Sequence, residues 1–94
     1  MSGFEPLSQA VPKTLATLLR STPMSPGKMA FVWKTVVGPA MDRSTFVRLD
    51  DRRLLVEAKT AAWAKEVSRS SHLILKRLQA LLGPDVISEL VVRV

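Results

Sequence analysis

Residues 61–83 read AAWAKEVSRSSHLILKRLQALLG. At about 3.6 residues per turn, this segment forms a helix with two different faces. The first face is almost entirely apolar and consists of Trp63, Val67, Ser70, Ile74, Leu78 and Leu81. The second face is cationic and consists of Lys65, Arg69, His72 and Lys76. The apolar face predicts burial against the rest of the domain, and the cationic face is either a solvated surface or a surface that holds a partner.

The helix has start and stop signals, and a hairpin precedes it. Thr60 is expected to be the N-cap, and Gly83 is expected to end the helix in a left-handed conformation. Before the helix, the hydrophobic period changes to two, which predicts strands over residues 45–49 and 54–59. Residues 50–53, the polar run DDRR, predict the turn between them. The turn type stays open, because no Asn-Gly or Asp-Gly pair is present.

Three further elements complete the pattern. A first helix is expected over about residues 11–21, where an apolar stripe recurs at helical spacing. A second is expected over about residues 26–41, with Ser25 as its N-cap, and Gly38-Pro39 should kink or restart it. Residues 86–94 alternate between two faces, which predicts a third strand.

The expected order of elements is therefore α-α-β-β-α-β. A hairpin, a crossover helix and a returning strand predict a small mixed three-stranded sheet with helices on one face, an α+β two-layer sandwich. A right-handed crossover through residues 61–83 places the apolar face of that helix on the sheet. We expect residues 1–10 to be a flexible N-terminus and residues 11–94 to form a single domain.

Composition narrows the classes of function. The chain has 94 residues with one histidine, no cysteine and no tyrosine, which leaves few nucleophile–base pairs and excludes thiol chemistry and disulfides. Its glycines are dispersed, so no glycine-rich phosphate loop is present. Asp50 and Asp51 are interpreted as solvated turn residues, and His72 as a surface residue. We expect no enzymatic activity, no metal and no cofactor.

The charge balance favours a polyanionic partner. Lysine and arginine number 14 against 8 acidic residues, a net charge of +6. Such a charge is typical of nucleic-acid-binding proteins and is also compatible with solubility alone. No apolar run is long enough to span a membrane, and the first residues lack the features of a signal peptide. A cytoplasmic location is therefore expected.

The cations gather in the second half of the chain. Those interpreted as candidate nucleic-acid contacts are Arg43, Arg48, Arg52, Arg53, Lys59, Lys65, Arg69, Lys76 and Arg77. Arg48 and Lys59 share the outward face of their strands with Phe46, which resembles a platform on which bases stack. The alternative is a polar sheet face whose Phe46 is covered by the N-terminal helix. For the cationic face of the long helix, phosphate contact and plain solvation both stay open.

Residues 33–40, WKTVVGPA, resemble the helix of the DciA family that carries the pattern W-x-x-V-V-G, and DciA is a bacterial family long catalogued as a domain of unknown function. The similarity continues through Leu54-x-Val56 of the hairpin, through Trp63-Ala64 in the long helix and through Leu81-Leu82-Gly83 at its end. It covers about residues 12–94. Each motif is weak singly, whereas their order and spacing together are specific.

The resemblance implies a KH-like fold and a role in bacterial replication. Members of the family are associated with the replicative DNA helicase, assist its loading onto DNA, bind nucleic acid and work without ATP hydrolysis. Nucleic-acid-binding KH domains clamp the backbone with a GxxG loop. Residues 38–41, Gly-Pro-Ala-Met, do not supply this loop, so surface cations are expected to replace it. Many members carry a further extension that contributes to helicase contact. Here residue 94 follows the last strand directly, so helicase contact is expected to be either weakened or confined to the globular part.

The favoured hypothesis is a non-enzymatic replication accessory protein, cytoplasmic and nucleoid-associated, that binds single-stranded or duplex DNA and the replicative DNA helicase. Phe31 and Phe46 are the candidate partner-binding residues. One alternative is a protein–protein adaptor with incidental charge, which uses these residues and Val91 or adds a strand at a sheet edge. A second alternative is an RNA-binding KH-like protein. Sequence specificity and oligomeric state stay open.

Overall fold

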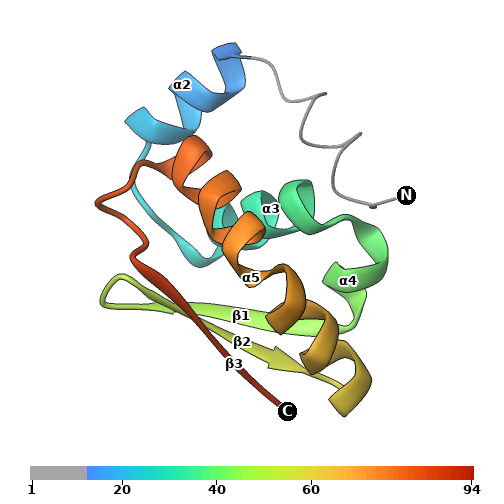
Figure 1. The fold of residues 1–94 in the computed structure, drawn as a ribbon. Helices are drawn as coiled ribbons and strands as arrows, with labels where there is room; N and C mark the ends of the chain where they lie inside the picture. Colours follow the sequence, from blue (N-terminus) through green and yellow to red (C-terminus); the bar gives the residue numbers. More distant parts are fainter. Residues whose placement is uncertain (1–12) are drawn as a thin grey trace.

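The computed structural model describes residues 13–94 and confirms the α+β class (Figure 1). Its elements in chain order are α2 (Lys13–Ser21), α3 (Pro26–Val37), α4 (Pro39–Arg43), β1 (Thr45–Asp50), β2 (Arg53–Ala58), α5 (Ala61–Leu82) and β3 (Glu89–Arg93). The sheet forms one layer, and the helices lie on one side of it (Figure 1). The segment expected to be flexible, residues 1–10, lies outside the described residues.

The chain restarts its helix at Gly38, as the Gly-Pro pair predicts. Gly38 has a φ of 85°, a region that glycine enters without a Cβ clash, and Pro39 fits the first turn of a new helix. The Gly38 N–H donates to the Lys34 carbonyl at 2.9 Å and its carbonyl accepts from the Asp42 N–H at 3.0 Å. The expected helix over residues 26–41 is therefore two helices, α3 and α4, and the observed order is α-α-α-β-β-α-β.

The sheet has the order β1-β2-β3, with β1 antiparallel to β2 and β2 parallel to β3. The predicted alternation is confirmed, because Leu54 and Val56 of the central strand are fully buried beneath the helices. The residues that alternate with these along the three strands point to the other side of the sheet, which we call the outer sheet face. Its cross-strand rows are Phe46–Glu57–Arg93, Arg48–Leu55–Val91 and Asp50–Arg53–Glu89. None of the helices described between residues 13 and 94 covers this face (Figure 1).

Helix α5 begins and ends as predicted. The Thr60 hydroxyl accepts from the Trp63 N–H at 3.1 Å, and the Gly83 N–H donates to the Gln79 carbonyl at 2.8 Å. Most of the predicted apolar face is buried in the core, namely Val67, Ile74, Leu78 and Leu81. Trp63 is half-buried and packs against that core. The apolar face of the sequence is thus the contact between α5 and the sheet layer.

The last strand is shorter than its alternation predicts. A strand over residues 86–94 is expected, whereas β3 covers Glu89–Arg93. Ile87, which the alternation places on the outer face, is fully buried instead, and its carbonyl accepts from Gln79 Nε2 at 2.9 Å. The chain leaves α5 in the helical layer and must descend to the sheet before it can pair. Ile87 fills the core during that descent.

The hairpin turn has a backbone that favours glycine. Asp51 and Arg52 have φ values of 46° and 72°, and two positive φ values in a two-residue loop identify a type I′ turn. We expect Arg52→Gly to stabilise the domain by about 0.5–1 kcal/mol, because it relieves the left-handed strain of a side chain with a Cβ. The Arg52 carbonyl, which accepts from the Ser88 N–H at 2.7 Å, is retained. Urea unfolding measures the change.

The matched control for this prediction is Arg53→Gly, one residue further along. Arg53 opens β2, where glycine costs backbone entropy without relieving any strain. We expect this variant to lose about 0.5–1 kcal/mol. Loss of stability in both variants would contradict the turn assignment.

Candidate nucleic-acid interface

The cationic face of α5 is intact on the surface. Lys65, Arg69 and Lys76, which we call the α5 stripe, are all exposed, as is His72. At 100° per residue they lie roughly 180° around the helix axis from its buried side. Arg69 Nη1 is 3.2 Å from Glu66 Oε1, and both side chains are largely exposed. Such a pair is weak, so Arg69 stays available for phosphate contact, while Lys65 and Lys76 have no ion pair to break among the described residues.

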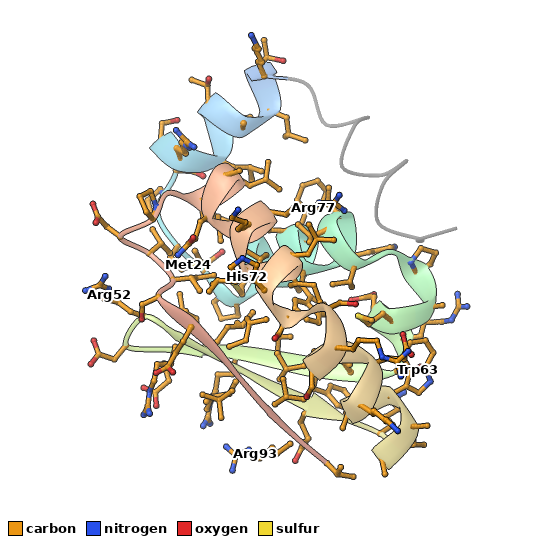
Figure 2. All side chains as sticks on the ribbon, viewed as in Figure 1. Met24, Arg52, Trp63, His72, Arg77 and Arg93 are labelled. Atoms are coloured by element: carbon orange, nitrogen blue, oxygen red, sulfur yellow. The ribbon has the colours of Figure 1, made fainter. Side chains whose placement is uncertain are left out.

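The outer sheet face carries the second group of cations. Its exposed large hydrophobic side chain is Phe46, at 63%, and Lys59 Nζ lies 5.4 Å from the centroid of the ring. Arg93 shares the row of Phe46 and projects away from the helices (Figure 2). An open depression of about 380 Å³ is lined by Phe46, Val47, Arg48, Leu55, Glu57 and Arg93. This half of the face combines an aromatic ring with several cations.

The end of the outer sheet face next to the hairpin turn is less cationic than the end around Phe46. Arg53 lies in register between Asp50 and Glu89, and opposite charges in such cross-strand positions offset one another. Arg52 projects from the turn at the far end of the hairpin (Figure 2). The cationic part of the face is therefore the half around Phe46, remote from the turn.

The predicted cations divide into separate surfaces. The α5 stripe and the outer sheet face point in opposite directions, because the buried side of α5 faces the sheet from the helical layer. Arg43 is exposed at the end of α4, and Arg77 is half-buried on α5, away from the stripe. Arg93 is absent from the predicted contacts, although the alternation of its strand places it on the outer face. The sequence signal was present in that alternation.

The two phenylalanines predicted to bind a partner are exposed on different surfaces. Phe31 is 50% exposed on the outer side of α3, and Phe46 lies on the outer sheet face. The alternative in which the N-terminal helix covers Phe46 is wrong. Helix α2 packs on α5 instead, where the Arg20 guanidinium donates to the Ala80 carbonyl at 2.6 Å. No adaptor surface that combines both phenylalanines is formed.

Neither a membrane-spanning helix nor a cluster of metal ligands is present in the part of the chain that the structure describes. Between residues 13 and 94, no helix is long and apolar enough to cross a membrane. Over the same residues, no group of three histidine, cysteine or acidic side chains is placed to hold a metal ion. The two cationic groups are the surfaces of this region that fit a polyanion.

The residues that carry the family resemblance are packing residues. Trp33, Val36 and Val37 are buried, and Gly38 occupies the positive φ at which the helix restarts. Leu54-x-Val56 contributes two fully buried side chains of the central strand. The motifs of the family resemblance therefore indicate the fold, and the candidate binding residues lie outside these motifs.

The chain matches a known protein family over most of its length. The family model described as "Dna[CI] antecedent, DciA" matches residues 6–92. The matched span contains every described helix and all of the sheet except the last residue of β3. No curated protein and no solved structure matches the chain.

Proposed function

Because this chain belongs to the DciA family, we propose that it is a non-enzymatic accessory protein that binds DNA and assists loading of the replicative helicase. Membership itself implies a role in replication related to helicase loading. The proposal adds direct DNA contact and a location in the cytoplasm at the nucleoid. It is supported by the net charge of +6 and by the placement of the cations on the surface.

The α5 stripe carries the DNA-binding proposal. Lys65 and Lys76 are eleven positions apart on one exposed side of α5, so they are about 16 Å apart along the helix axis. A B-form strand carries one phosphate per roughly 3.4 Å of its axis, and the stripe can therefore follow several phosphates. Contacts of this kind hold the backbone without reading bases, so binding is expected to be tolerant of sequence.

The Gly38 region supports this choice of surface. In KH domains that bind nucleic acid, the GxxG loop contacts the backbone. Here Gly38 joins two helices, and Met41 is buried with 7% exposure. Met41 stands where a GxxG loop has its second glycine, and its side chain is packed in the core, so residues 38–41 are not shaped as a phosphate clamp. In the KH-like arrangement that we propose, surface cations replace it.

Titration of the intact chain with duplex and single-stranded DNA over a salt series tests this proposal. Phosphate contact predicts a linear fall of log K with log salt, with a slope of about −0.9 per contact for duplex and about −0.7 for single strands. A stripe that makes three contacts predicts a duplex slope near −2.7. Affinity that is independent of salt, or undetectable for both forms, would refute the DNA-binding part.

The helicase part has its own test. A tagged chain is used to recover the replicative helicase from bacterial lysate, with and without nuclease treatment. We expect recovery to survive nuclease, since the proposal includes direct protein contact. Recovery that disappears with nuclease would show that DNA alone bridges the two proteins.

The adaptor function is a second candidate, and one observation favours it. Phe31 is 50% exposed on the outer side of α3, and a large exposed aromatic side chain is a common anchor in protein interfaces. We expect Phe31→Ala to weaken helicase recovery without changing DNA affinity. Helicase recovery from a chain that binds no DNA would establish the adaptor, and preference for RNA over DNA of one sequence would favour the RNA-binding alternative.

A further inference from the structure

We propose that the part of the outer sheet face around Phe46 is a stacking platform for single-stranded DNA. The inference rests on the proposed DNA binding and adds the form of DNA that one surface accepts. It also separates that surface from the α5 stripe, which lies on the opposite side of the molecule. The two surfaces therefore differ in both position and ligand.

The first step is the exposure of Phe46. The ring is 63% exposed on the edge strand β1, at one end of its cross-strand row, although burial of its apolar area would be favourable. Lys59 Nζ lies 5.4 Å from the ring centroid, and a cation at such an exposed site binds the ring only weakly. The ring therefore stays accessible to a base, and the nearby ammonium group is placed to meet the phosphate of a stacked nucleotide.

The second step is the neighbourhood of the ring. The next row holds Leu55 and Val91 beside Arg48, so apolar contact area continues across the sheet with a cation at its edge. Arg93 lies at the other end of the row of Phe46. Bases stacked on aromatic rings with phosphates near cations are the usual arrangement of single-strand sites. A duplex hides the faces of its bases, so this surface selects single strands.

The third step is the polarity of the face. The row at the turn contains Asp50 and Glu89 with one cation between them, which disfavours phosphates there. Near Phe46 the only acid in the row is Glu57. A single strand is therefore expected to lie across the Phe46 end of the sheet, with Glu57 as the group that limits its affinity.

The main experiment measures binding of oligo(dT) and of a duplex of the same length to Phe46 variants. We expect Phe46→Ala to weaken oligo(dT) binding roughly 5- to 100-fold, the range found for loss of one base stack, with duplex binding unchanged. Phe46→Leu keeps apolar area without a π face and should lose nearly as much. Phe31→Ala is the matched control on another surface and should bind oligo(dT) as the unaltered chain does.

Two further variants change exposed side chains of the outer sheet face and are expected to bind oligo(dT) at least as well as the unaltered chain does. Glu57→Gln removes the repulsive charge and should strengthen oligo(dT) binding roughly two- to fivefold, as expected for one exposed charge interaction. Phe46→Trp should keep binding and show fluorescence that oligo(dT) quenches beyond the signal from Trp33 and Trp63. The absence of both effects would overturn the platform.

The outcomes separate this inference from the proposed function. Binding of both DNA forms by the unaltered chain, with no loss of oligo(dT) affinity in Phe46→Ala and Phe46→Leu, refutes the platform and leaves DNA binding intact. No DNA binding by the unaltered chain refutes both. A dimer that Phe46→Ala dissociates in light scattering would mean that a second copy occupies the face, which also overturns the inference.

Discussion

The double variant Lys65→Ala with Lys76→Ala is expected to bind duplex DNA roughly 60-fold more weakly than the unaltered chain at about 0.1 M salt. Each lost phosphate contact removes about 0.9 from the slope of log K against log salt. A salt concentration of about 0.1 M is one decade below 1 M, so the loss of two contacts lowers log K by about 1.8. The slope should become shallower by about 1.8 in the same titration. Fluorescence anisotropy with a labelled duplex measures both quantities.

The matched control removes the same number and type of charges elsewhere. Lys13 and Lys34 are also exposed lysines on helices, and neither belongs to the α5 stripe. The double variant Lys13→Ala with Lys34→Ala has the same net charge as the stripe variant, so it should show only a small, general loss. Equal losses in both variants would mean that net charge governs binding and that the stripe is solvated surface.

Replacing Trp33 by alanine is expected to cost about 3–5 kcal/mol of unfolding free energy. Trp33 is 1% exposed at the centre of the core, and its removal leaves a large cavity between α3 and the sheet. Small domains have only about 5–15 kcal/mol in total, so much of the chain would be unfolded at 37 °C. Urea unfolding followed by circular dichroism measures the loss. A cost near 1 kcal/mol would contradict the central position of the indole.

The indole also has a polar role that a double-mutant cycle isolates. Trp33 Nε1 donates to Thr45 Oγ1 at 2.9 Å, and Thr45 Oγ1 donates to the Met41 carbonyl at 2.7 Å. Thr45→Val leaves the buried Nε1–H of Trp33 without its acceptor, at about 1–3 kcal/mol. After Trp33→Phe the Thr45 hydroxyl keeps its bond to the Met41 carbonyl and loses only the bond from the indole. The double variant removes both partners of the first bond, so we expect it to lose less than the sum. Strict additivity would show that the bond contributes nothing.

The spacing of apolar residues in the sequence was sufficient to predict most of the helices and strands. Leu54 and Val56 are buried as alternation predicts, and Val67, Ile74 and Leu78 are buried as helical spacing predicts. The restart of the helix at Gly38 follows from the Gly-Pro pair, as predicted. One expectation fails, because Ile87 is buried although strand alternation places it outside. There the connection from the helical layer to the sheet overrides the local period.

The candidate site was predictable only in part. Residue type and parity placed Arg48, Phe46 and Lys59 on one sheet face, and helical spacing placed the α5 stripe on one side of α5. The same reasoning left out Arg93, although the alternation of its strand places that residue on the outer face. Its row with Phe46 and Glu57 follows only from strand pairing. It also counted Arg53 as a contact, whereas strand pairing sets two carboxylates beside that residue.

The sequence by itself determined the α+β class, the inward face of each long element and the family, because these follow from residue spacing within single segments and from packing motifs such as WKTVVGPA. Only the tertiary structure decided that the cations form two surfaces on opposite sides of the domain. It also decided that Phe46 stands exposed beside Lys59, with Arg93 at the other end of its row. The physical reason is that a surface is made by segments far apart in the chain, and strand pairing and helix packing bring them together.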